Sequence, residues 1–121
     1  MSSSTTPSAP VYFDVALALA QIGDPEAVRG ILVMVEESLQ RDIPAIAQLL
    51  AAGDVQGANQ LLHPLKGFIP IFCREALCQH VGRVEGLSKS GSTAEVGQAY
   101  VALQPELEQL LAEVSNYLKA Q

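Results

Sequence analysis

Residues 25–52 have the sequence PEAVRGILVMVEESLQRDIPAIAQLLAA. Apolar side chains recur in it every three or four residues, the spacing that gathers them on one face of an α-helix. These side chains are Val28, Ile31, Leu32, Val35, Leu39, Ile43, Ile46 and Leu50. Asp24 suits the N-cap and Pro25 the first helical position, so the stretch predicts one long helix. Pro44 is expected to kink it near Arg41.

Shorter amphipathic patterns on both sides predict the neighbouring helices. Residues 12–22 are expected to form a short N-terminal helix, and residues 55–72 a helix that begins after a Gly-Asp pair. Residues 74–87 are expected to form the next helix, and residues 88–91 a loop.

The last helix is expected to begin after Ser92, because Glu95 three residues later fits a capping box. Its apolar residues alternate in steps of three and four, as in a bundle helix. They are Val96, Tyr100, Leu103, Leu107, Leu110, Val114 and Tyr117. Pro105 is expected to bend or split this helix.

No stretch alternates with a period of two, so the sequence predicts an all-α protein. The expected architecture is an antiparallel four-helix bundle over residues 11–121, with a short extra helix at its N-terminal end. Residues 1–10, MSSSTTPSAP, are rich in Ser, Thr and Pro and are expected to be a disordered tail.

Length and charge restrict the possible functions. The chain has 121 residues, enough for one domain, and a net charge of -6, which argues against a large basic surface for nucleic acid or an anionic membrane. The longest apolar run, residues 31–35, is too short to span a membrane, and residues 1–10 do not resemble a secretory signal. Two cysteines make no disulfide framework, so we expect a cytoplasmic protein with free thiols.

The helix predicted over residues 55–72 carries His63 on its polar side. At 100° per residue, the apolar positions Leu61, Leu65, Phe68 and Phe72 lie opposite this histidine. Its own side holds Gln56, Asn59, Gln60, Lys66 and Gly67. A glycine inside a helix costs about 1 kcal/mol relative to alanine, so Gly67 suggests that a partner approaches the backbone there.

Basic residues are concentrated in the same part of the chain. Residues 56–90 contain four bases, Lys66, Arg74, Arg83 and Lys89, and two acids, which gives this segment a charge of +2 and the rest of the chain -8. The sequence therefore predicts that an acidic protein gathers its bases around an exposed histidine.

The run His63-Pro64-Leu65-Lys66-Gly67 resembles the H-x-L-K-G motif of histidine-containing phosphotransfer (HPt) domains. Further likenesses are two Gly-Asp helix starts, a proline near the centre of the long helix, and a following helix with a late glutamate. The residues concerned are Gly23, Asp24, Pro44, Gly53, Asp54 and Glu85. The resemblance covers roughly residues 12–118.

This resemblance implies a phosphorelay intermediate without enzyme activity of its own. His63 would be the phosphoacceptor, Lys66 would steady the phosphoryl oxygens, and Gly67 would let a partner pack closely. Partner contacts are expected at Gln56, Asn59, Gln60, Gly67, Pro70 and Arg74. The implied partners are response-regulator receiver domains and a hybrid sensor histidine kinase; Mg²⁺ is expected on the receiver, and the chain itself is expected to be a monomer without cofactor.

The segment after the motif departs from the family, which usually has small polar residues there. This chain has Phe68-Ile69-Pro70-Ile71-Phe72, in which Pro70 should end the helix early. Pro64 directly follows the histidine and should kink the helix at that point. These departures leave an alternative open: a non-phosphorylated helical adaptor that binds or sequesters a receiver or kinase through the same face.

A metal site is not expected. Cys73, Cys78 and His80 have no spacing typical of zinc ligands, and the two cysteines lie 140° apart on one helix.

Overall fold

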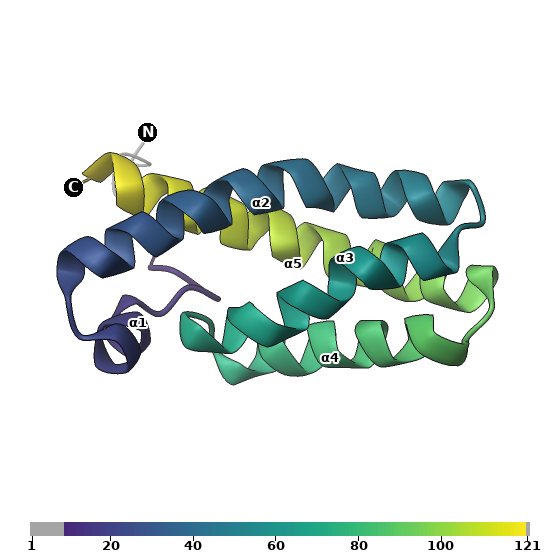
Figure 1. The fold of residues 1–121 in the computed structure, drawn as a ribbon, viewed down its shortest axis with the longest axis horizontal. Coiled ribbons are helices and arrows are strands. Elements are labelled where there is room, and N and C mark those ends of the chain that lie inside the picture. The colour runs from purple at the N-terminus through teal and green to yellow at the C-terminus, as the bar shows by residue number, and fades with distance from the viewer. Residues whose placement is uncertain (1–8, 121) are drawn as a thin grey trace, which may run out of the picture.

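A computed structural model of the chain describes residues 9–120, which form a bundle of α-helices (Figure 1). The helices are α1 (Val15–Ile22), α2 (Pro25–Ala51), α3 (Val55–Phe68), α4 (Glu75–Ser90) and α5 (Thr93–Ala120), with a 3-10 turn, η1 (Ile69–Ile71), after α3. Helix α2 packs against α3 and α5, and α4 packs against the same two helices from the other side. This confirms the predicted antiparallel four-helix bundle with an extra N-terminal helix. The expected disordered tail lies mostly in residues 1–8, outside the described part of the chain.

The apolar stripes predicted for the long helices form the core. Of the eight stripe residues in α2, seven are buried and Ile31 is half-buried. Tyr100 of α5 is also buried, and its hydroxyl donates a hydrogen bond of 2.7 Å to the Ile43 carbonyl of α2. Burial of these stripes fixes which face each helix turns outward.

Helix starts agree with the predicted caps. The Asp24 carboxylate accepts a hydrogen bond from the Ala27 amide, and the Asp54 carboxylate accepts one from the Gly57 amide. Ser92 and Glu95 form the reciprocal capping box, because the Ser92 amide donates to Glu95 and the Glu95 amide donates to the Ser92 hydroxyl.

Three helix boundaries differ from the predictions by more than one residue. Helix α1 begins at Val15 rather than Tyr12, because Asp14 caps it by accepting a hydrogen bond from the Leu17 amide. Helix α3 ends at Phe68 rather than Phe72, and the chain tightens into η1 at Pro70, which has no amide hydrogen for an α-helical bond. Helix α4 continues to Ser90, so the predicted loop over residues 88–91 is wrong for residues 88–90, and the turn between α4 and α5 is confined to residues 91 and 92.

The prolines inside helices do not interrupt them. Helix α2 runs through Pro44, α3 through Pro64 and α5 through Pro105. Pro105 was expected to bend or split the last helix; the structure shows no split, and α5 remains one element.

An extended segment, residues 10–14, holds the end of the bundle together; we call it the N-terminal strap. The amides of Val11, Tyr12 and Phe13 all donate to the Glu113 carboxylate of α5, at 2.7, 3.0 and 2.9 Å. On its other edge the strap forms a short β-bridge between Phe13 and Cys73. The strap therefore joins α5 to the segment that leads into α4.

The strap also lowers the pKa of the Glu113 carboxyl. Burial alone would raise this pKa, but hydrogen bonds from Gln109 and from the three strap amides stabilise the anion and hold the pKa below its usual value of 4.5. A depressed pKa means that the anion stabilises the fold above pH 4.5. This contribution is lost as the pH falls through the lower pKa of the folded state.

Replacing Glu113 by Gln should lower the free energy of unfolding by about 1–3 kcal/mol at pH 7, because an amide NH₂ would face backbone donors. The variant should also lose less stability than the wild type as the pH falls below 4.5. Urea unfolding at a series of pH values measures both effects. Glu108→Gln is the matched control, since the Glu108 carboxylate on the same helix is exposed; equal stability of all three proteins would contradict this account of the strap.

Candidate functional site

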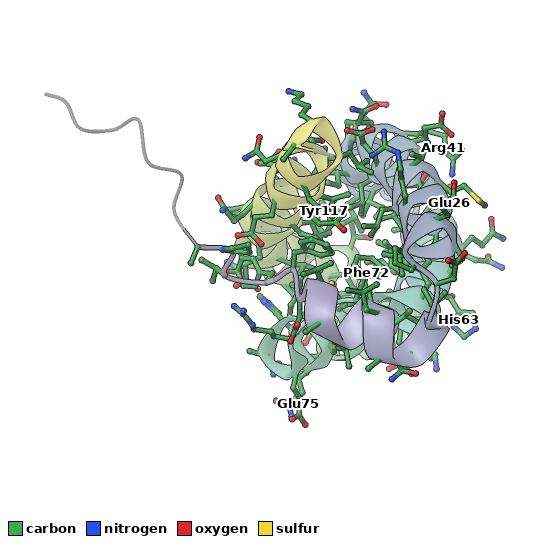
Figure 2. All side chains as sticks on the ribbon, turned by 90° about the vertical axis from the view of Figure 1, so that its left-hand side faces the viewer. Glu26, Arg41, His63, Phe72, Glu75 and Tyr117 are labelled. Atoms are coloured by element: carbon green, nitrogen blue, oxygen red, sulfur yellow. The ribbon has the colours of Figure 1, made fainter. Side chains whose placement is uncertain are left out.

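His63 projects from α3 into solvent. Its side chain is 68% exposed, whereas Leu62 and Leu65 on the same helix are completely buried. Figure 2, viewed along the bundle, shows His63 at the rim and Phe72 toward the centre. The orientation agrees with the helical wheel, which places the apolar arc opposite the histidine.

Beneath His63 lies a carboxylate from the neighbouring helix. Glu85 of α4 has no exposed side-chain surface, and its Oε2 atom is 3.1 Å from His63 Nδ1. Its other oxygen, Oε1, is 3.4 Å from Lys66 Nζ and 3.6 Å from Lys89 Nζ. Asn59 Nδ2 donates to Oε2 at 3.2 Å. These five residues form what we call the Glu85 cluster.

A second layer of hydrogen bonds fixes the cluster to both helices. Asn59 Nδ2 on α3 also lies 2.8 Å from Ser88 Oγ on α4, and the Ser88 hydroxyl donates to the Glu85 carbonyl at 2.6 Å. Ser88 is buried. The contact between α3 and α4 is therefore polar around Asn59, which connects the two helices.

Several groups keep Glu85 ionised. Burial alone would raise the pKa of its carboxyl, but hydrogen bonds from His63, Asn59 and Lys66 and the positive charge of Lys89 outweigh burial and lower the pKa. An ionised carboxylate only accepts hydrogen bonds. A neutral His63 must therefore carry its proton on Nδ1, where it donates to Glu85.

This tautomer leaves the other ring nitrogen reactive. Nε2 of a neutral His63 has a free lone pair, and the ring that carries it is exposed. A neutral imidazole nitrogen is a good nucleophile near neutral pH. The arrangement can therefore present one oriented nucleophile to a partner from outside.

Gln56 and Asn59 line a polar hollow on one side of the cluster, together with Ser88 and Lys89. Gln60 is exposed beside them on α3. These three predicted contact residues therefore share the face of His63. Asn59 is also occupied by its bonds to α4.

Gly67 is exposed one turn beyond His63. A Cβ atom built at this position would meet nothing within 4 Å. Since the folded chain itself leaves room for a side chain there, intramolecular packing does not require a glycine at this position.

Pro70 and Arg74 lie elsewhere. Both line a hollow against α1, next to Asp14 and Leu17. The Arg74 guanidinium donates to the carbonyls of residues 10 and 11 in the strap, at 2.6 and 3.0 Å. Arg74 thus has a structural partner that the sequence did not indicate.

Of the four basic residues predicted around the histidine, only two contact the carboxylate beneath it. Lys66 and Lys89 belong to the Glu85 cluster, whereas Arg74 holds the strap and Arg83 lines a hollow between α4 and α5. The prediction that the bases gather around His63 is therefore correct for the two lysines alone.

Sequence reasoning missed the central role of Glu85 and the contribution of Lys89. One signal was available. The buried stripe of α4 runs through Leu77, Val81 and Val84, and Glu85 directly follows the last of these residues. A carboxylate on the edge of a buried stripe requires a partner from another helix.

The second histidine has a different setting. His80 Nδ1 lies 2.8 Å from Glu106 Oε1 of α5, and the His80 side chain is only 16% exposed.

Cys73 is buried, and this burial raises the pKa of its thiol well above the usual range. In residues 9–120, no three His, Cys, Asp or Glu side chains come together as metal ligands would. None of the helices between those limits is long and apolar enough to cross a membrane.

No protein-family model, curated protein or solved structure matches this chain. The features of this chain that bear on its function are therefore the Glu85 cluster and the sequence motif around His63.

The tautomer of His63 can be tested by ¹⁵N NMR. At a pH where the ring is neutral, we expect a protonated Nδ1 and an unprotonated Nε2. Glu85→Ala should remove this preference, whereas Glu85→Gln should retain it because the amide oxygen still accepts. The His80 signals serve as an internal control and should not change. A wild-type His63 ring protonated mainly on Nε2 would show that Glu85 does not set the tautomer.

Proposed function

We propose that this protein is a cytoplasmic histidine phosphocarrier in a multistep two-component phosphorelay, similar to HPt domains. His63 would accept a phosphoryl group from the aspartyl phosphate of one receiver domain and pass it to another receiver. The main supporting observation is the exposed His63 ring, whose Nδ1 is held by the buried, ionised Glu85.

The transfer step follows from this geometry. The Nε2 lone pair attacks phosphorus and an N–P bond forms, while the P–O bond to the aspartate breaks and its electron pair stays on the released carboxylate. No proton has to leave in this step, because the Nδ1 proton stays in its hydrogen bond to Glu85. The ring becomes positively charged, and the Glu85 carboxylate stabilises this charge.

The same interaction favours the return step. A phosphorylated ring that keeps its Nδ1 proton leaves as a neutral imidazole when a second aspartate attacks phosphorus. Phosphoryl transfer depends mainly on positioning and on neutralising the oxygens. In our proposal Lys66 neutralises part of the negative charge on the phosphoryl oxygens. The receiver domain supplies Mg²⁺ and the aspartate.

The adaptor alternative depends on the apolar segment over residues 68–72. Ile69 and Phe72 are buried in the core, and the ring of Phe68 stacks on Phe72 with centroids 6.0 Å apart. Ile69 and Phe72 therefore belong to the core and not to a partner surface, which favours the carrier over the adaptor.

Replacing His63 by Gln should abolish phosphorylation and change the free energy of unfolding by less than about 0.5 kcal/mol, since the side chain is exposed. His80→Gln is the matched control and should still be phosphorylated. The measurement is incorporation of acid-labile, alkali-stable phosphate from phosphoramidate or from a phosphorylated receiver domain. Absence of such phosphate on the wild type would favour the adaptor, and phosphate lost only in His80→Gln would place the carrier at His80.

Replacing Gly67 by Leu should stabilise α3 by several tenths of a kcal/mol, because leucine has the higher helix propensity and its Cβ atom would meet no neighbour. It should weaken binding of a receiver domain about tenfold or more, since the side chain would stand between the two proteins. Calorimetric titration measures the affinity. Gly97→Leu on α5, the helix diagonal to α3, is the control, as its Cβ position is also open. Equal affinities would show that no partner packs over Gly67.

A further inference from the structure

Two lysines from different helices share one oxygen of the buried carboxylate. Lys66 Nζ of α3 is 3.4 Å and Lys89 Nζ of α4 is 3.6 Å from Glu85 Oε1. His63 uses the other oxygen of the same group. Both ammonium groups are therefore close to the reactive imidazole.

The antiparallel packing of α3 and α4 places these lysines on opposite sides of His63. Asn59 contacts Glu85 and Ser88, so the turn of α3 before His63 is level with the end of α4. Lys89 follows Ser88 at this level, whereas Lys66 lies one turn after His63. The two lysine side chains thus start from backbone positions toward opposite ends of α3, and their ammonium groups meet at one oxygen of Glu85.

Both lysines also face open space. Their side chains are 48% and 56% exposed, and Lys89 lines the polar hollow with Gln56, Asn59 and Ser88. An ammonium group has three donors, and one contact with Glu85 leaves others free for a second acceptor.

The local charge around Glu85 shows why one lysine is not enough to attract a phosphoryl group. With a neutral His63, the two lysines and Glu85 give a local charge of +1. A phosphoryl group brings about two negative charges at neutral pH. Without Lys89, Glu85 would cancel the charge of Lys66, and an incoming phosphoryl group would meet no net positive charge on this chain while the His63 ring is still neutral.

We infer that Lys89 is a second phosphoryl-binding residue that completes a two-lysine cradle over Glu85. This inference rests on the proposed carrier function and adds a residue outside the H-x-L-K-G motif. The buried carboxylate anchors both ammonium groups before the phosphoryl group arrives, so less reorganisation is needed during transfer.

The test uses phosphoramidate as a small donor, so that receiver docking does not contribute. The full chain is compared with Lys89→Ala, Lys89→Arg and Lys66→Ala, and Arg83→Ala is the matched control because this cation lines a different hollow on α4. The rate of phosphohistidine formation is one measurement. The second is the pH titration of the phosphoryl ³¹P signal, which a purely structural role of Lys89 would not move.

We expect Lys89→Ala to slow phosphorylation about fivefold, close to the effect of Lys66→Ala and equivalent to an exposed ion pair of about 1 kcal/mol. The pKa of the phosphoryl group, which the ³¹P titration measures, should rise in Lys89→Ala because a nearby positive charge is lost. It should return to the wild-type value in Lys89→Arg. Arg83→Ala should match the wild type in both measurements.

Two results would overturn the inference in different ways. If the wild type is phosphorylated and Lys89→Ala matches it in rate and titration, Lys89 does not bind the phosphoryl group and the carrier function is unaffected. If the wild type acquires no phosphohistidine from either phosphoramidate or a phosphorylated receiver, the carrier function fails and the cradle fails with it.

Discussion

The buried carboxylate of Glu85 is the constraint on which the site depends. An ionised group without solvent contact is tolerated only when it is paired and hydrogen-bonded. Helix α3 supplies three of these partners, Asn59, His63 and Lys66, and α4 supplies the fourth, Lys89. The need to neutralise one carboxylate thus determines the orientation of the imidazole, the position of two ammonium groups and the alignment of α3 with α4.

The apolar core makes this arrangement possible because it fixes both helices before any polar contact is considered. Leu62 and Leu65 bury one face of α3, which turns His63 outward, and the stripe of α4 leaves Glu85 just below the surface. A carboxylate deeper in the bundle would be beyond the reach of solvent-exposed lysines. One farther out would be hydrated and would not orient the imidazole.

The sequence predicted what depends on local periodicity. The order of helices, the caps at Asp24 and Asp54, and the exposure of His63 all follow from spacing along single helices. The Glu85 cluster joins residues of α3 to a glutamate of α4 that lies 19 to 26 positions away in the chain, and only the packing of the two helices reveals it. The same reason explains the error over Arg74, whose partners are backbone carbonyls of the strap, and over Ser88, which lies in α4 and is buried against Asn59 of α3.

The two prolines near His63 are tolerated for different physical reasons. Pro64 removes the hydrogen bond that the Gln60 carbonyl would accept, but this side of α3 is exposed, so water can take the place of the lost donor. Pro70 ends the α-helix, yet the core holds the chain beyond it. Phe72 packs near Phe13 of the strap, and the ring centroids of Phe13 and Tyr117 are 5.3 Å apart. The C-terminal end of α3 is thus anchored by buried rings, while Glu85 anchors its middle. The segment from His63 to Gly67 lies between these two anchors, so the chain can hold its histidine in one orientation although its sequence after Gly67 differs from the pattern usual in HPt domains.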